Sequence, residues 1–323
     1  TTGMTKVLVV GGYGAFGALV SERLARNADL DVIVAGRRPD MARAAVARLA
    51  PNAAARLEAA EIDATKPHLD ALRRLKPSVI VNASGPFQTQ DYTLARAAIA
   101  IGAHCVDLAD ARGYVAGITA LDADAKAAGV LVVSGASTVP AVSSAVIDNL
   151  LPRFERLDAI SYGIAPGNAY DPGLATTASI LSWAGKPFDT LFDGTMQPVL
   201  GWQSIHRHRF PTIGARWMAN CDIPDLALFP QRYPSLRTQR FYAGTEVAAM
   251  HLGLWALSGL VRAGLVSRLE RLAPLLLRAK RLLAFLGTDT GGMFLETRGV
   301  GLDGQPHTLA WHLEAKSGHG PYI

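Results

Sequence analysis

The stretch Lys6–Gly17, KVLVVGGYGAFG, decides the fold of the first half of this 323-residue chain. The run Val7–Val10 is apolar and rich in β-branched residues, which is typical of a buried strand in a parallel sheet. Gly12, Gly14 and Gly17 follow at the G-x-G-x-x-G spacing, and apolar residues then recur at helical intervals. A glycine-rich turn between a strand and a helix predicts a dinucleotide-binding unit.

Each glycine in this turn has a physical reason. Gly12 lets the chain reverse tightly, Gly14 lets the backbone approach a pyrophosphate, and Gly17 lets the helix lie close to the strand. The helix N-terminus then offers free N–H groups and the positive end of its dipole to the phosphate. The alternative is an ordinary glycine-rich turn between a strand and a helix. The predicted cofactor-binding residues of this turn are Gly12, Tyr13, Gly14, Ala15, Phe16 and Gly17.

Two arginines follow the second predicted strand, residues 31–35. An NAD site usually carries Asp or Glu at this point, where the carboxylate binds the ribose 2′-hydroxyl. The planar guanidinium group of arginine suits a 2′-phosphate instead, which a carboxylate would repel. Arg37 and Arg38 therefore predict NADP in preference to NAD. The alternative is that one of them only faces solvent in a turn.

Apolar strand segments alternate with helical segments through the first half, which predicts an α/β fold with a Rossmann-type doubly wound parallel sheet. Ligands of such sheets bind outside the carboxyl ends of the strands. Asp63 ends the third strand, where it either accepts a hydrogen bond from the adenine amino group or caps the next helix. Strands are expected at 7–10, 31–35, 57–62, 78–82, 104–108 and 130–133, and the polar residues Arg37, Ser84, Asp107, Asp110 and Ser137 are expected to face one crevice.

The pattern changes after residue 150, which predicts a first domain over 1–150 and a second, α+β domain over 151–323. The step Asp303-Gly304 between two strand-like segments marks a β-hairpin. We therefore expect a mainly antiparallel second sheet, of the kind that often forms the surface of a homodimer. Strands are expected at 159–164, 203–210, 237–243, 294–301 and 306–315, and a helix at 174–184.

The segment 247–286 is a helical insertion with an unusual composition. Its first part is apolar almost all round, and its second part carries leucines at helical spacing beside a stripe of arginines: Arg268, Arg271, Arg278 and Arg281. The segment could be a lid over a cleft, a dimer element, or a helix lying on an anionic membrane surface. Ordinary burial against its own domain or a partner subunit is favoured over the membrane. The longest uncharged apolar stretch, 247–261, is too short to span a bilayer.

Composition excludes several classes of protein. Hydrophobic residues make up 50% of the chain and charged residues 18%, which indicates a globular protein. The net charge of +5 comes without a basic patch interleaved with aromatic residues, so nucleic-acid binding is not expected. His206 and His208 lie on one face of a predicted strand, but no third ligand is near in sequence and we predict no metal. The two cysteines do not belong to a C-x-x-C pair, and we recognise no secretory signal. Both observations predict a cytoplasmic protein.

Four segments, GGYGAFG, VIVNASGPF, HCVDLAD and SGASTVPAVSSAVID, resemble the saccharopine dehydrogenase family with its NADP-binding domain. The resemblance covers about the first 150 residues. It implies an NAD(P)-dependent oxidoreductase, whose best-known relatives act on a C–N bond that joins an amino acid to a keto acid or aldehyde. The cofactor-binding positions that it implies are Gly12, Gly14, Gly17 and Arg37, and more loosely Ser84, Gly85 and Asp107. Pro86, next to Gly85, is a further candidate for binding the cofactor.

The resemblance supplies no catalytic residue, so these candidates rest on position alone. We predict Asp110 and Tyr170 as catalytic residues, and Arg112, Thr176 and Arg240 as groups that bind the substrate. No tyrosine is followed by lysine four residues on, which disfavours a short-chain dehydrogenase. The leading hypothesis is an NADP-dependent oxidoreductase of a small-molecule substrate. The alternatives are a non-catalytic NADP-binding sensor or scaffold, and a membrane-surface oxidoreductase acting on a lipid-like substrate.

Overall fold

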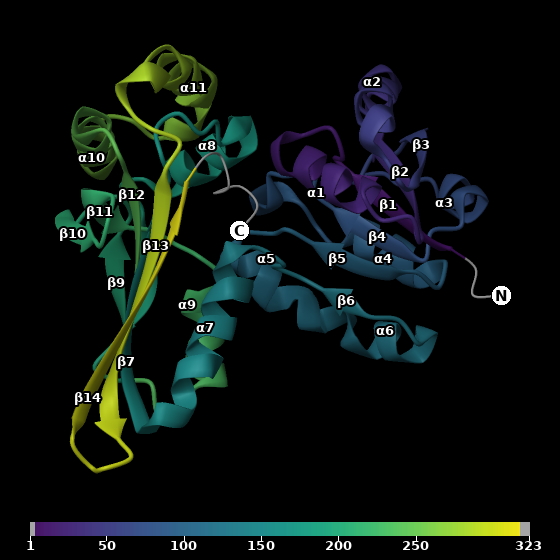
Figure 1. Ribbon diagram of the computed structural model, residues 1–323. Helices are drawn as coiled ribbons and strands as arrows, with labels where there is room; N and C mark the ends of the chain where they lie inside the picture. The colour runs from purple at the N-terminus through teal and green to yellow at the C-terminus, as the bar shows by residue number, and fades with distance from the viewer. Residues whose placement is uncertain (1–3, 317–323) are drawn as a thin grey trace. The chain divides into compact units, whose positions relative to one another are not determined.

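The computed structural model describes residues 4–316, and the chain divides into two compact units that meet in sequence between Ser137 and Thr138 (Figure 1). This boundary lies ahead of the expected one at residue 150. The reason is the helix α7 (Ser143–Leu150), whose Ile147 and Leu150 pack in the core of the second unit beside Leu157. Although α7 directly follows the last strand of the first sheet, it belongs to the second unit.

The first unit is built on a six-stranded parallel sheet in the order β3-β2-β1-β4-β5-β6, which confirms the Rossmann-type α/β fold. Leu8 and Val10 of β1 pack on one face of this sheet, while Val7 and Val9 pack on the other. β1 and β2 contain continuous apolar runs because both of their faces are buried. The strands are β1 (Thr5–Val10), β2 (Leu30–Gly36), β3 (Arg56–Glu61), β4 (Val79–Asn82), β5 (His104–Asp107) and β6 (Val132–Val133).

Helices connect these strands as the alternation predicted, with differences at their ends. The third helix begins at Leu69, because Asp63–Thr65 forms a turn and Pro67 precedes the N-cap His68. The short helix α5 was not predicted. The helices of this unit are α1 (Ala15–Ala25), α2 (Pro39–Leu49), α3 (Leu69–Leu75), α4 (Thr93–Ala100), α5 (Arg112–Gly117) and α6 (Asp122–Ala128).

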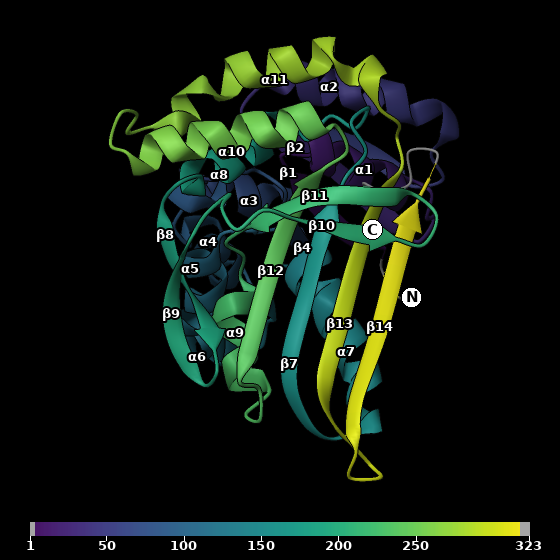
Figure 2. The same ribbon diagram turned by 90° about the vertical axis from the view of Figure 1, so that its left-hand side faces the viewer.

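The second unit contains a mixed sheet in the order β10-β11-β12-β7-β13-β14, which Figure 2 shows face on. Only β12 and β7 run parallel within it, so the prediction of a mainly antiparallel sheet is confirmed. The hairpin at Asp303-Gly304 joins β13 to β14 as expected. The strands are β7 (Phe154–Ala165), β10 (His206–Phe210), β11 (Gly214–Asn220), β12 (Thr238–Thr245), β13 (Gly291–Gly301) and β14 (Pro306–Ala315).

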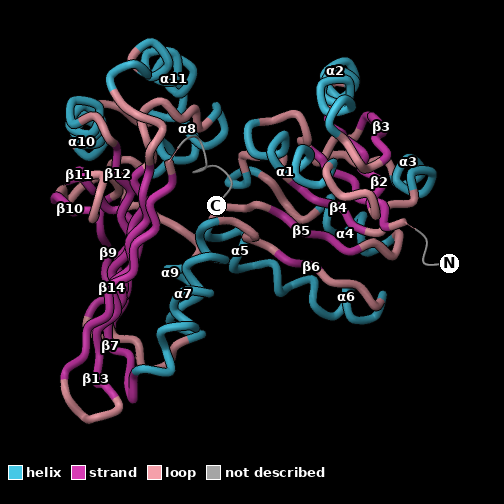
Figure 3. The backbone as a smooth tube through the Cα atoms, in the orientation of Figure 1, coloured by secondary structure: helices cyan, strands magenta, loops and turns pink. Residues whose placement is uncertain are grey.

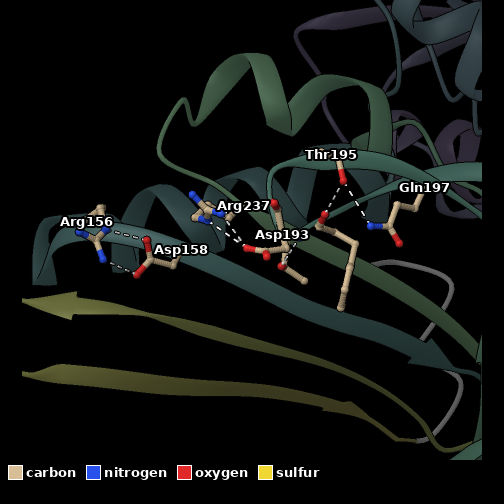
Figure 4. A network of polar contacts seen from close by, with 8 residues as sticks. Arg156, Asp158, Asp193, Thr195, Gln197 and Arg237 are labelled. Atoms are coloured by element: carbon tan, nitrogen blue, oxygen red, sulfur yellow. Dashed lines mark hydrogen bonds and ion pairs between the residues drawn. The ribbon is translucent and has the colours of Figure 1, made fainter.

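A separate two-stranded hairpin, β8 (Pro187–Phe192) and β9 (Thr195–Leu200), was not predicted. Polar contacts fix its turn to the start of β12 (Figure 4). The Arg237 guanidinium donates to Asp193 Oδ1 at 2.7 Å, and the Gly194 N–H donates to the Arg237 carbonyl at 2.7 Å. The charged side chains of this network are largely exposed, so each ion pair contributes only about 0–1 kcal/mol. The network positions a turn and is not a site.

The helices of the second unit form two groups, which Figure 3 shows as cyan segments beside magenta strands. The first group, α7 and α9, packs on β7 and β13 through a large core that contains Ile147, Phe229 and Leu295. The second group surrounds Trp202, with Leu181 from α8 and Ala273 from α11 buried in the same cluster. The remaining helices are α8 (Gly173–Trp183), α9 (Asp225–Arg232), α10 (Ala248–Arg262) and α11 (Ala273–Leu282).

Candidate dinucleotide site

The turn after β1 depends on a glycine that the motif does not count. Gly11 has a φ of +81°, and a Cβ added there would lie 2.8 Å from the Ala83 carbonyl carbon. The N–H groups of Gly11 and Gly12 both donate to the Ala35 carbonyl, at 2.8 and 3.1 Å. Gly11, and not Gly12 as expected, therefore provides the left-handed conformation that turns the chain.

Gly12 and Gly17 are required by close packing. A Cβ on Gly17 would lie 2.0 Å from the Gly11 carbonyl oxygen, which is the close approach of helix to strand expected for the third glycine. A Cβ on Gly12 would lie 2.9 Å from Ser21 Oγ, and that hydroxyl donates to the Gly12 carbonyl at 3.0 Å. The hydrogen bond of Ser21 thus joins α1 to the turn.

The N-terminus of α1 fits a phosphate. Its N-cap, Gly14, supplies no side-chain cap, and its first turn holds no acidic residue. A Cβ on Gly14 would meet one atom within 4 Å, the Gly11 carbonyl oxygen at 3.1 Å, so a ligand can approach this backbone from the open side. The first turn therefore presents N–H groups and the positive end of the helix dipole to an anion.

Two exposed guanidinium groups stand at the carboxyl end of β2. Neither Arg37 nor Arg38 forms an ion pair with any residue of the described range 4–316. Tyr13 lies against Gly36, where a Cβ would come within 2.5 Å of its hydroxyl, and that hydroxyl accepts the Arg38 N–H at 3.0 Å. The Tyr13 hydroxyl thus holds the backbone at the end of β2. Both arginine side chains remain available to a phosphate.

Asp63, which follows β3, lies near enough to Arg37 for the arginine charge to act on its carboxylate. The Thr65 N–H and hydroxyl donate to its Oδ1 at 2.9 and 2.8 Å. The Thr65 N–H and, more weakly, the nearby Arg37 hold the pKa of Asp63 below its usual range. Because α3 begins only at Leu69, the interpretation of Asp63 as a helix cap is wrong, and its contact with adenine stays a prediction.

Asn82 orders the loop after β4. This buried amide accepts hydrogen bonds from the Ser84 N–H at 3.1 Å and from the Ser84 hydroxyl at 2.5 Å. Gln90 donates to the Ser84 carbonyl, which closes the loop. Gly85 and Pro86 are exposed at its tip. Ser84, Gly85 and Pro86 therefore lie at the carboxyl end of the strand beside β1, where the predicted cofactor contact requires them.

The side chain of Asp107 is buried and held by hydrogen bonds. Its Oδ1 accepts hydrogen bonds from the Ala109 N–H, the Gly135 N–H and the Ser134 hydroxyl, at 3.0, 2.9 and 2.8 Å. Burial raises the pKa of Asp107, and the three hydrogen bonds oppose that effect. The carboxylate joins the end of β5 to the loop after β6. Its structural role is to hold these two segments together, and its contact with the cofactor stays a prediction.

Asp110 and Arg112 follow on the same edge of the sheet. The Gln88 amide donates to Asp110 Oδ1 at 3.4 Å, which connects the loops after β4 and β5. Arg112 is half-buried and is the first residue of α5. The structure thus gathers the predicted polar residues of the first unit at the carboxyl ends of neighbouring strands.

Tyr170 belongs to the second unit, in a loop that the helical insertion holds. Lys280 of α11 donates to the carbonyl oxygens of Asn168 and Tyr170, and Glu246 accepts the Asn168 N–H at 2.7 Å. Burial, followed by the charge of Asp171, raises the pKa of the Tyr170 phenol to about 12. The phenol is therefore protonated throughout the physiological range.

Thr176 and Arg240 have different surroundings. Thr176 lies in the first turn of α8, where the Asp171 carboxylate already accepts the Gly173 N–H at 2.9 Å and forms an ion pair with Arg281. A carboxylate at this helix N-terminus disfavours a second anion there. Arg240, on β12, is half-buried with its guanidinium 5.0 Å from the centre of the Phe192 ring.

The histidines of β10 are packed among aromatic rings. His208 stacks on Phe294 at a centroid distance of 3.6 Å, and its Nε2 lies 3.3 Å from the Nε2 of His312. Burial, with the charge of His312, lowers the pKa of His208. Within residues 4–316, no group of three or more His, Cys, Asp or Glu is arranged to hold a metal ion.

Sequence reasoning missed several residues that shape this site. Gly11 could have been found from the glycine pair that opens the turn. Asn82 could have been found in the same way, because it acts on Ser84, only two residues further on. Ser134 could not, because it acts on Asp107, which the pairing of β5 with β6 brings near.

Comparison with known proteins agrees with this geometry. Residues 7–133 match the family described as the saccharopine dehydrogenase NADP binding domain. No curated protein sequence matches the chain. Among solved structures, apo saccharopine dehydrogenase (L-Glu forming) from Saccharomyces cerevisiae is similar over 96% of this chain and 85% of its own, with 15% identity and a TM-score of 0.66.

Two further structures match with lower scores. GenD2 from gentamicin A biosynthesis, in complex with NAD, covers 95% of this chain and 72% of its own, with 15% identity and a TM-score of 0.44. A short-chain dehydrogenase from Sphingobium yanoikuyae, in complex with NADPH, covers 40% and 69%, with 20% identity and a TM-score of 0.31. The chain therefore has the fold of saccharopine dehydrogenase, and its residues 7–133 match the NADP-binding domain of that family.

Proposed function

We propose that this protein is an oxidoreductase that prefers NADP and acts on a C–N bond that joins an amino acid to a keto acid, or on a related carbonyl substrate. The observation that carries the cofactor preference is the pair of exposed guanidinium groups at the end of β2, Arg37 and Arg38, which have no ion-pair partner in residues 4–316. A 2′-phosphate would supply one, because arginine binds phosphate through charge-assisted hydrogen bonds.

The chain's own groups have separate tasks in this proposal. The first turn of α1 holds the pyrophosphate, and Arg37 and Arg38 hold the 2′-phosphate. When bound, NADP supplies the chemistry of hydride transfer. Asp110 lies on the edge of the sheet where a substrate would meet the cofactor, and it is our first candidate to hold or move a proton.

The remaining candidates are weighed by their surroundings. With its raised pKa, Tyr170 donates a hydrogen bond at neutral pH and does not act as a base. Arg112 and Arg240 are half-buried cations that suit the carboxylate of an amino-acid substrate, whereas Thr176 shares its helix terminus with Asp171. We therefore rank the two arginines above Thr176 as substrate-binding groups.

The test is a screen of amino acids paired with keto acids, in which NADPH and NADH oxidation are followed by absorbance. We expect turnover with at least one pair and a preference for NADPH. Asp110→Asn should lower kcat by roughly 10²-fold or more, the usual contribution of a general acid or base, while NADPH affinity is kept. NADPH binding without turnover of any pair would favour the non-catalytic sensor instead.

A further inference from the structure

The helical insertion carries an exposed apolar surface. Figures 1 and 2 place α10 and α11 at the same end of the second unit, opposite the β13–β14 turn. Leu275 and Leu282 are 63% and 77% exposed, and Phe285, just after α11, is 79% exposed. We name the following set the arginine–leucine surface: Leu252, Trp255, Leu260, Leu265, Leu272, Leu275, Leu282, Leu283, Phe285, Leu286, Arg262, Arg268, Arg271 and Arg278.

The outer side of α10 has no charge along most of its length. No charged residue occurs between Ala248 and Val261. His251 and Ser258 face inward and are fully buried, whereas Leu252 and Trp255 face outward and are 39% and 41% exposed. Helices that face water in globular proteins carry charged or polar residues on that side. The outer face of α10 therefore requires a cover.

The positive charge of the chain is concentrated in the same segment. Residues 248–286 hold six of the 32 lysines and arginines and one of the 27 acidic residues, so the rest of the chain has equal numbers of both. Arg262, Arg268, Arg271 and Arg278 are exposed and form no ion pair with any residue of the described range. These guanidinium groups are available to anions outside the protein.

This surface could be covered by a second copy of the chain or by an anionic bilayer, and its charge distinguishes the two. In a symmetric dimer the same patch meets itself, so the four arginines of one copy would face those of the other. The one acidic residue of the segment, Glu270, is half-buried beside Lys186 and cannot neutralise them. An anionic bilayer offers phosphates to the arginines and an apolar boundary to the leucines and to Trp255.

We propose that α10, α11 and residues 283–286 dock the protein onto an anionic lipid bilayer, with both helices lying in the plane of the surface. No helix within residues 4–316 is long and apolar enough to cross a bilayer, which agrees with a surface position. The binding is to lipid alone and requires no cofactor, so it stands or falls independently of the proposed reaction.

Flotation with phosphatidylcholine vesicles, with and without phosphatidylglycerol, tests this proposal. We expect the wild type to float only with the phosphatidylglycerol vesicles. Arg271→Gln combined with Arg278→Gln should weaken binding about 30-fold, since each arginine near an anionic surface contributes about 1 kcal/mol. Arg74→Gln combined with Arg209→Gln removes two exposed arginines elsewhere and should leave binding unchanged.

The apolar half of the surface has its own test. Leu275→Ser combined with Leu282→Ser should abolish flotation, whereas Leu302→Ser, a 75% exposed leucine at the β13–β14 turn, should not. Circular dichroism checks that each variant is folded. Failure of the wild type to float, or equal loss in the control variants, overturns the proposal. So does a dimer in sedimentation that dissociates in the Leu275→Ser, Leu282→Ser variant.

Discussion

The proposed preference for NADP depends most on Arg37. We expect Arg37→Asp to lower NADPH affinity by roughly 10- to 150-fold, because a charge-assisted hydrogen bond to phosphate contributes about 1.5–3 kcal/mol. NADH lacks the 2′-phosphate, so its affinity should change little. Calorimetric titration of both cofactors measures the difference, with Arg48→Ala on α2 as an exposed control. Equal affinities of the wild type for NADPH and NADH would rule out the phosphate assignment.

Gly17 tests the packing beneath the same site. The methyl group of Gly17→Ala would lie 2.0 Å from the Gly11 carbonyl oxygen, so α1 must move away from the turn. We expect the free energy of unfolding to fall by roughly 1–3 kcal/mol, as for other overpacked sites, and NADPH affinity to fall with it. Urea denaturation and NADPH titration give the two values. Gly113→Ala on α5, where a Cβ meets nothing within 4 Å, should lower neither.

At the scale of elements, the start of α9 holds a carboxyl group whose charge the fold disfavours. Asp225 is fully buried, and Ser143 of α7 donates to its Oδ2 at 2.6 Å. Burial raises the pKa of Asp225 to about 7, although the Ser143 hydrogen bond opposes the shift. The folded state thus binds the proton more tightly than the unfolded chain, so this group lowers the free energy of unfolding as pH rises from about 4 to 7.

Asp225→Asn should remove this loss. Relative to the wild type, the variant should gain roughly 3–4 kcal/mol as pH rises across that window, because one pKa unit corresponds to about 1.4 kcal/mol. The difference between the two proteins must be measured, since His251 of α10 acts in the opposite direction. Burial lowers the pKa of His251 to about 4, so His251 costs stability as pH falls below about 6.5. A difference in urea midpoint that is independent of pH would contradict the assignment to Asp225.

The elements that the sequence predicted and those it did not differ in a physical way. Parallel strands buried on both faces, such as β1, β2 and β4, read directly as apolar runs between helices. The second unit offers weaker signals: β8 begins with Pro187, and α9 contains Pro230, so neither pattern reads as a regular element. Hairpins were predicted where the turn was explicit, as at Asp303-Gly304, and missed at Asp193-Gly194, where the flanking strands were not recognised.

The candidate site divides in the same way. Gly12, Gly14, Gly17 and the two arginines were found because their spacing follows from one strand and one turn, whereas Gly11 was missed. Asp107 was placed correctly at the end of β5, but its hydrogen bonds to Ser134 and Gly135 depend on the pairing of two strands. The ion pair of Asp171, beside the start of α8, likewise joins it to Arg281, more than a hundred residues later. Contacts between distant residues are a product of the fold and leave no local pattern.

At the scale of the whole molecule, the sheet order predicts where NADPH will slow amide exchange. The neighbours of β1 are β2 and β4, so the loops at residues 11–17, 36–38 and 83–86 lie at adjacent strand ends although they are far apart in sequence. A dinucleotide bound there covers all three loops together. We therefore expect NADPH to protect these three segments in hydrogen–deuterium exchange followed by mass spectrometry.

Anionic vesicles should give the complementary pattern. They should slow exchange in residues 252–286, because docking covers α10 and α11, and should leave 11–17 unchanged. The comparison separates two surfaces with different ligands: a phosphate-binding strand edge, and an arginine–leucine surface whose leucines are more than half exposed at Leu275, Leu282 and Leu286. Protection of 252–286 by NADPH in the absence of lipid would contradict the assignment of this surface to lipid.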